Sequence, residues 1–231
     1  MPGLFLDYWY LILVVPALLI SLWAQVKVKS TFKKYSSRRV GCGMTGADAS
    51  RRIQQANGIA VGITGVAGSL TDHYDPRTNM IALSQDVLNC PSVAAVGVAA
   101  HETGHALQHA SQYAPVRLRT AMVPVTNICS TVSPYLVIAG LLTGYYPLAY
   151  IGVVLFSVAV FFQLVTLPVE FDASHRAVAA LESGGCLTEE ELSGVRKVLT
   201  AAALTYVAAL LVSLMSLLRL ILVITGRRRN R

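Results

Sequence analysis

Four long apolar tracts dominate the pattern of hydrophobic and polar positions along the chain. They cover residues 4–26, 121–143, 147–168 and 199–225. A membrane-spanning helix needs about 20 predominantly apolar residues, so each tract is long enough to cross a bilayer. The pattern therefore predicts about four transmembrane helices. The first is a retained anchor, because no small-residue cleavage site follows it, and the next two form a hairpin around GYYP.

The polar stretch between the first two tracts predicts a small α+β unit. Thr45 and Asp48 have the spacing of a capping box, and Gly58 suits a helix end, so we expect a helix over 46–57. The glycine-rich residues 58–76 favour short strands and tight turns. Residues 79–84 nearly alternate and predict a short edge strand. Ser92 then caps a helix of about 18 residues that carries three of the five histidines.

Composition agrees with a membrane protein. The chain has 231 residues, 54% of them hydrophobic, with a mean hydropathy of +0.56. The net charge of +7 comes from basic residues that flank the apolar tracts, and no recognition motif accompanies them, so nucleic-acid binding is excluded as a function.

The basic residues also indicate how the chain crosses the membrane. Residues 27–119 hold 11 Lys and Arg and residues 170–197 hold 3, against four in the tail RRRNR. The positive-inside bias places the two larger segments in the cytoplasm and the N-terminus outside. The tail either violates the bias, or the fourth tract, which contains Arg219, re-enters or lies along the membrane.

The four cysteines form no CxxC pair. Cys42, Cys90, Cys129 and Cys186 are widely spaced, which predicts neither a disulfide framework nor a thiolate metal site and suits a reducing compartment.

The string HETGH, residues 101–105, carries the candidate chemistry. Residues four apart lie on one face of a helix, so His101 and His105 can bind one Zn²⁺ while Glu102 reaches a water as general base. The alternative is a helix with buried histidines and no metal, which is costly without partners for the ionisable groups. Zinc is the favoured interpretation.

A third protein ligand is needed. His109 is disfavoured because it lies about 12 Å from His101 along a straight helix. The remaining candidates on the same side are His73, His175, Asp72, Asp75, Glu170 and Asp172. Glu170 is preferred because it opens a charged cluster where the third tract ends. Its alternative role is an interfacial carboxylate that only marks that end.

Four strings, in order, resemble a known family. They are GSLTDHYDPRTN, LSQDV, SVAAVGVAAHETGHALQHASQYAPVRLRT and LPVEFDASHRAVAAL. They are similar to the YugP-type neutral zinc metallopeptidases of prokaryotic membranes, over about residues 4–225. The arrangement also resembles the HtpX-like and CAAX-processing membrane gluzincins. The resemblance implies His101, His105 and Glu170 as zinc ligands and Glu102 as the base.

One correspondence with the gluzincins fails. Their ligand glutamate is followed four positions later by an acidic residue that orients a zinc histidine, whereas position 174 here is Ser. Asp172 is nearby, but residues two apart point in different directions on a helix. The resemblance therefore leaves open which group orients the histidines, and the candidates for a supporting contact include Asp172 and Ser174.

Other polar residues are candidates for binding substrate. His175, Arg176, His73 and Tyr74 could stabilise a developing oxyanion, and His109 could take a supporting role. The segment TDHYDPRT is either a loop beside the cleft or a plain polar turn. The expected edge strand 79–84 could pair with an extended substrate.

We therefore expect a mainly α-helical integral membrane protein with a zincin-like α+β unit. It forms one metallopeptidase domain over residues 1–231, with a catalytic segment 27–120, a hairpin 121–168 and a ligand-bearing segment 169–198. The expected function is zinc-dependent endopeptidase cleavage of peptides or membrane-protein segments, with one Zn²⁺ per chain and the active site on the cytoplasmic side. The alternatives are a zinc-binding membrane protein without proteolytic activity and a small transporter component.

Overall fold

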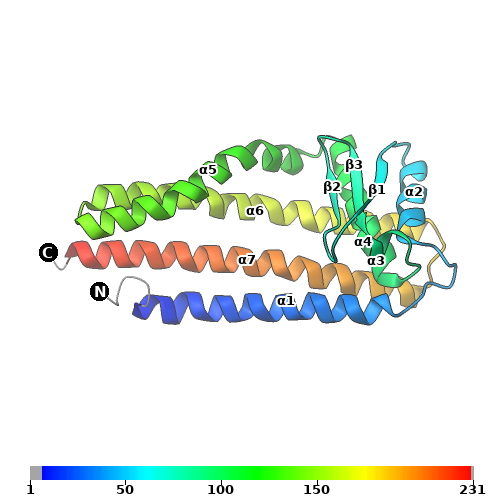
Figure 1. The fold of residues 1–231 in the computed structure, drawn as a ribbon, viewed down its shortest axis with the longest axis horizontal. Coiled ribbons are helices and arrows are strands. Elements are labelled where there is room, and N and C mark those ends of the chain that lie inside the picture. Colours follow the sequence, from blue (N-terminus) through cyan, green and yellow to red (C-terminus); the bar gives the residue numbers. More distant parts are fainter. Residues whose placement is uncertain (1–6, 230–231) are drawn as a thin grey trace. The chain divides into compact units, whose positions relative to one another are not determined.

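The computed structural model describes residues 7–229, so the start of the first tract and the last two residues of the basic tail lie outside the described residues. Figure 1 traces the chain. Its elements are η2 (Tyr10–Val14), α1 (Val15–Ser36), α2 (Gly46–Ala56), β1 (Gly62–Val66), β2 (His73–Asp75), β3 (Met80–Ser84), α3 (Gln85–Leu88), α4 (Val93–Ala110), α5 (Ala114–Thr143), α6 (Tyr146–Ser183) and α7 (Glu189–Arg229).

Four helices are long and apolar enough to cross a membrane, which confirms the predicted number. They are Tyr10–Ser36, Ala114–Thr143, Tyr146–Ser183 and Glu189–Gly226. Each continues beyond its apolar tract, and α6 runs through Pro168 into the segment that carries Glu170. The fourth tract lies within one unbroken helix, which rules against a re-entrant path.

The chain divides into two compact units. The first contains residues 1–25, 118–167 and 205–231, and the second contains residues 26–117 and 168–204. In the first unit α5 and α6 pack closely, since a Cβ on Gly140 would clash with the backbone nitrogen of Ala149. Ser133 is buried there and donates a 2.8 Å hydrogen bond to the Gly152 carbonyl.

Arg219 and Asp7 also belong to the first unit and form an ion pair. Arg219 Nη2 lies 2.6 Å from Asp7 Oδ2, and its guanidinium stands over the Tyr10 ring at 5.1 Å. The charge of Arg219 inside the apolar tract is therefore balanced by a partner carboxylate and an aromatic face, as a charge in an apolar setting requires.

The second unit holds the small sheet (Figure 1). Its order is β1-β3-β2, with β1 parallel and β2 antiparallel to β3. The expectation that residues 79–84 form an edge strand is therefore wrong, because β3 is central. Ile81 and Leu83 are fully buried, as a strand with neighbours on both sides permits. The edges are β1 and β2, and β2 takes up part of the segment expected as a turn.

Helix α2 begins as the sequence predicts. Thr45 Oγ1 accepts from the Asp48 N–H, and Asp48 accepts from the Thr45 N–H, so the capping box is complete. The helix ends before Gly58, whose positive φ of 64° is the left-handed conformation that glycine adopts without strain.

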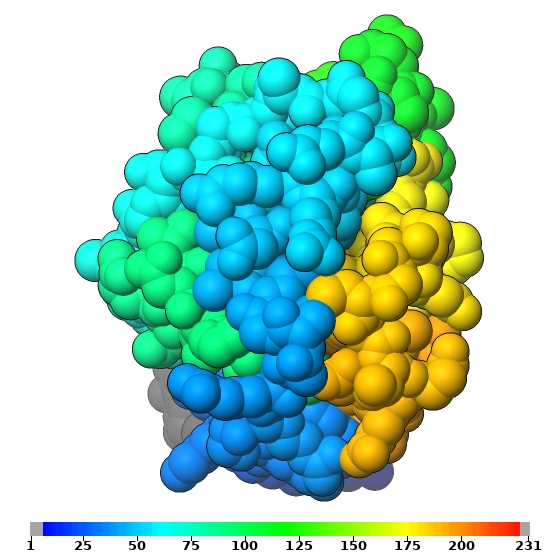
Figure 2. All heavy atoms as spheres, turned by 90° about the vertical axis from the view of Figure 1, so that its right-hand side faces the viewer, coloured from blue at the N-terminus to red at the C-terminus, as the bar shows by residue number. Residues whose placement is uncertain are grey.

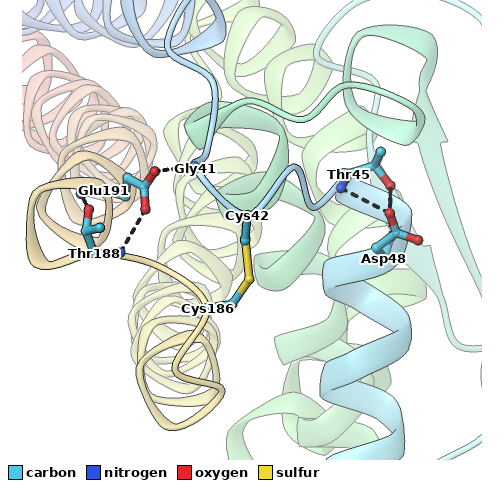
Figure 3. The surroundings of a disulfide bond; sticks show 7 residues. All are labelled: Gly41, Cys42, Thr45, Asp48, Cys186, Thr188 and Glu191. Carbon is cyan, nitrogen blue, oxygen red and sulfur yellow. Dashed lines mark hydrogen bonds between the residues drawn. A yellow bond between two sulfur atoms is a disulfide. The ribbon is translucent and has the colours of Figure 1, made fainter.

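A disulfide joins Cys42 to Cys186, 144 residues apart in sequence. Figure 3 shows the bond between the loop after α1 and the turn between α6 and α7. Figure 2 shows these two segments side by side on the surface, in blue and in yellow to gold. The expectation of no disulfide is therefore wrong. Spacing rules detect cysteines that are close in sequence, whereas this pair is brought together by the fold.

Hydrogen bonds to Glu191 hold the same two segments. Its carboxylate accepts from the Gly41 N–H at 2.7 Å and from the Thr188 N–H at 2.7 Å (Figure 3). Thr188 in turn accepts from the Glu191 N–H, which is the reciprocal pattern of a capping box at the start of α7. The disulfide thus lies in a region that is already ordered by a helix cap.

Candidate metal centre

Helix α4 brings the two histidines of HETGH to one face. Ser92 caps its first turn by accepting from the Ala95 N–H at 3.2 Å. Ala94, Ala95, Val96, Ala99 and Ala100 are fully buried, so small side chains hold the helix inside the second unit. One turn apart, the rings of His101 and His105 lie 4.7 Å between centroids in an edge-to-face arrangement.

Helix α6 brings Glu170 to the same place. A Cβ on Gly104 would lie 2.5 Å from the Ala173 carbonyl oxygen, so the glycine between the histidines lets the backbones of α4 and α6 approach closely. Glu170 Oε2 lies 3.3 Å from His101 Nε2 and 3.6 Å from His105 Nε2. The Glu170 carboxylate is only 2% exposed.

These three side chains fit a zinc ion. Their candidate ligand atoms all lie within 4.8 Å of one another. Tetrahedral zinc with bonds of about 2.0–2.1 Å places neighbouring ligand atoms about 3.3 Å apart, close to both imidazole–carboxylate distances. Two neutral imidazoles and one carboxylate, with the fourth position open, are also a donor set of catalytic zinc sites.

Ser174 contacts His101. The Ser174 hydroxyl oxygen lies 3.1 Å from His101 Nδ1, and Ser174 is the residue four positions after Glu170. The residue four positions after Glu170 therefore reaches His101 with a hydroxyl. A hydroxyl can accept the Nδ1 proton and so leave the Nε2 lone pair facing Glu170.

Gln108 contacts His105, and the sequence analysis did not identify it. Its amide nitrogen donates to Asp172 Oδ2 and to the Val169 carbonyl, both at 2.8 Å. The amide oxygen must then be the acceptor that lies 3.0 Å from His105 Nδ1. This arrangement makes His105 the donor at Nδ1 and frees its Nε2 for a metal.

Asp172 therefore acts on His105 through Gln108 and makes no direct contact with either histidine. Its Oδ2 also accepts from Arg176 Nε at 2.6 Å. Gln108 lies three residues after His105, on the same face of α4. That spacing was the available signal for it in the sequence.

Glu102 lies close enough to the site to affect it electrostatically. It is 9% exposed. Burial alone would lower the pKa of His105, but the hydrogen bond with Glu170 and the negative charges of Glu102 and Glu170 raise that pKa overall. A site that favours positive charge at this point also favours a divalent cation.

The other candidate residues lie apart from the three ligand atoms. His109 is outside the metal-binding group found among residues 7–229, and its ring packs on Tyr74 of β2 at 5.5 Å. His73 and His175 are exposed. Arg176 stands over the Tyr113 ring.

Two further carboxylates from the sequence analysis have structural roles. Asp72 accepts from the Ser84 N–H at 2.7 Å, which ties the start of β2 to the end of β3. Asp75 accepts from the Arg77 N–H at 2.9 Å and so orders the turn after β2. Neither belongs to the metal-binding group.

Comparisons with known proteins agree with this chemistry. A family model described as "Putative neutral zinc metallopeptidase" matches residues 10–225. The chain is 49% identical over 223 residues to a protein of Bacillus subtilis (strain 168) named "Putative membrane protease YugP", which covers 96% of this chain and 99% of that protein. No solved structure matches the chain.

Proposed function

Because the chain belongs to the family described as "Putative neutral zinc metallopeptidase", we propose that it is a membrane-bound zinc-dependent endopeptidase of the gluzincin type. His101, His105 and Glu170 hold one Zn²⁺ per chain, and Glu102 is the general base. The observation that carries the proposal is the convergence of two imidazole nitrogens and one buried carboxylate at the spacing of tetrahedral zinc.

The residues around the metal have distinct tasks. When bound, zinc would act as a Lewis acid that lowers the pKa of a water molecule and polarises a peptide carbonyl. Glu102 accepts the proton of the attacking water and returns it to the leaving amine. Ser174 accepts a hydrogen bond from Nδ1 of His101, and Gln108 accepts one from Nδ1 of His105, so that each ring presents Nε2 to the metal.

The proposed substrate is an extended segment of a peptide or a membrane protein. β2 is an edge strand of the sheet and packs on α4 through the contact between Tyr74 and His109. In this proposal its outer edge pairs with an extended chain beside the helix that carries HETGH. Burial, and then the charge of Asp75, raise the pKa of Tyr74, and its hydroxyl donates to Asn79 Oδ1 at 3.1 Å.

We propose the cytoplasmic side for this site because the 11 basic residues of segment 27–119 belong with it. The disulfide between Cys42 and Cys186 is the observation that argues for the opposite side, since disulfides persist in oxidising compartments. Trapping the cysteines in living cells decides between the two, as described in the Discussion.

Two variants of the purified full chain test the peptidase proposal. His105→Ala should lose bound zinc, measured by elemental analysis. Glu102→Gln should keep zinc near one per chain and lose cleavage of an unstructured fluorogenic reporter by about 10²–10⁴-fold, the usual contribution of a general base. Glu189→Gln makes the same change at an exposed residue of α7 and should leave both measurements unchanged.

Two results would contradict the proposal. Wild-type protein without zinc, prepared without chelator, would remove the metal centre. If the wild type binds zinc but cleaves no reporter faster than Glu102→Gln does, that result would favour a zinc-binding membrane protein without proteolytic activity.

A further inference from the structure

A basic groove lies between α1 and α7 in the second unit. Its volume is about 550 Å³. Four cationic side chains line it, namely Lys27, Lys34, Arg196 and Lys197, and no carboxylate does. On α1 the groove is lined by Lys27 and by the residues three, four and seven positions after it. This spacing places them on one helix face. The groove is therefore a concentrated positive site built by two facing helices.

Most of this charge is not neutralised within the protein. Arg196 forms an ion pair with Glu182 at 3.3 Å. Within residues 7–229, Lys27, Lys34 and Lys197 form no ion pair. The hydroxyls of Thr31, Ser193 and Thr200 also line the groove and donate no hydrogen bond to any of the described residues. The ammonium of Lys34 lies 5.7 Å from the centroid of the Tyr35 ring. The groove thus combines cations that form no ion pair with hydroxyls that donate to none of the described residues, which is the chemistry that binds a phosphate.

The groove also lies where both helices change from apolar to polar. On α1 the apolar tract ends at residue 26, directly before Lys27, and on α7 the tract begins at residue 199. Ala201 and Leu204 form the apolar end of the groove. Lys27 and Lys34 are about 10 Å apart along a helix axis, comparable with a headgroup layer of about 5–8 Å on each side of the hydrocarbon core.

We propose that this groove binds the phosphate of an anionic phospholipid headgroup. The ammonium groups of Lys27, Lys34 and Lys197 surround the phosphate, the hydroxyls donate to its oxygens, and the acyl chains leave past Ala201 and Leu204. A phospholipid is the favoured source of the phosphate because the groove opens from a polar to an apolar end at membrane depth. The inference does not depend on the proposed peptidase activity.

A pair of matched variants tests the site. Lys27→Gln with Lys34→Gln removes two charges from the groove. Lys29→Gln with Lys33→Gln removes two charges from the same helix, but both residues are exposed and do not line the groove. Binding of a fluorescent phosphatidylglycerol to the full chain in neutral detergent should weaken about tenfold or more in the groove variant and less than twofold in the control. Zinc content should be equal in both.

Three results would overturn the inference. Equal weakening in both variants would indicate diffuse attraction by basic residues rather than a site. Wild-type binding of phosphatidylcholine as tightly as phosphatidylglycerol would exclude recognition of an anionic headgroup. Competition by millimolar inorganic phosphate as effective as competition by the lipid would make this a site for free phosphate. Elution volume and zinc content of each variant establish that it is folded.

Discussion

Gln108 connects the two halves of the candidate site at the scale of single residues. It is fully buried and contacts His105, Asp172 and the Val169 carbonyl. It therefore sets the proton position on His105, a candidate ligand on α4, while holding α6 beside it. Because the Gln108 amide is buried and hydrogen-bonded, it holds the His105 ring in one orientation. A side chain that is already held in this way loses less conformational entropy when it binds a metal.

Gln108→Met should weaken zinc binding. Methionine keeps the unbranched shape but leaves the His105 Nδ1 proton without its acceptor and removes the hydrogen bonds to Asp172 and the Val169 carbonyl. Loss of such an outer partner costs about 10–100-fold in metal affinity, to be measured by competition with a zinc chelator. Gln112→Met, at an exposed position just beyond α4, is the control. Equal affinity in Gln108→Met and wild type would show that Gln108 does not position His105.

The candidate ligands of the site could be predicted, but their supporting partners only in part, since Ser174 was among the candidates and Gln108 was not. The placement of the two histidines of HETGH on one helix face follows from the sequence alone, because four residues make about one turn of any helix. The contacts of Ser174 with His101, and of Gln108 with Asp172 and Val169, depend on how α6 is rotated about its axis relative to α4, which no short sequence pattern encodes. A comparison with gluzincins by position alone pointed to a missing acidic residue, whereas the structure places a serine hydroxyl on His101.

The approach of α4 to α6 controls the site at the scale of elements. Gly104 stands between the two candidate ligand histidines, where a Cβ would lie 2.5 Å from the Ala173 carbonyl oxygen of α6. Small residues continue this contact on α6, since Ala173 and Ala177 are fully buried. The distances from Glu170 to the two imidazoles therefore depend on the absence of a single methyl group.

Gly104→Ala should open the site. Its Cβ would lie 2.5 Å from the Ala173 carbonyl oxygen, which is backbone and cannot rotate away, so the helices must separate. We expect zinc affinity to fall about tenfold or more even though alanine favours a helix by about 1 kcal/mol over glycine. The measurement is the same chelator competition.

Gly97→Ala is the matched change on the same helix. Its Cβ would meet a Val195 methyl at 3.2 Å, and a side chain can shift by the few tenths of an ångström required. This variant should keep wild-type zinc affinity. Equal affinities in both alanine variants would show that helix separation does not limit the metal site.

The helices were more predictable than the sheet for a physical reason. Capping residues and apolar periodicity are local, and they located α2, α4 and the four long helices. Strand order depends on pairing between segments that are distant in sequence, so residues 79–84 were assigned to an edge although β3 lies between β1 and β2. The near-complete burial of Ile81, Ala82, Leu83 and Ser84 follows from that central position.

At the scale of the whole molecule, two features indicate opposite sides of the membrane for the second unit. The basic residues indicate the cytoplasm, and the disulfide indicates an oxidising compartment. If the second unit faces the cytoplasm, as we propose, Cys42 and Cys186 should be thiols in living cells and become bonded after lysis in air. Acid quenching followed by labelling with a maleimide polymer should then add two more labels per chain than in protein purified in air. A Cys42→Ser/Cys186→Ser variant should show no such difference. Bonded cysteines in quenched cells would place the unit on the oxidising side.

The link between Cys42 and Cys186 also bears on how damage to this protein can be seen. A chain that is cut once between these two residues keeps both pieces in one covalent molecule. HETGH and Glu170 both lie within that interval, so the pieces that carry them stay attached to each other. A single self-cleavage between Cys42 and Cys186 in an oxidised sample would leave its size on a denaturing gel unchanged until a reductant is added.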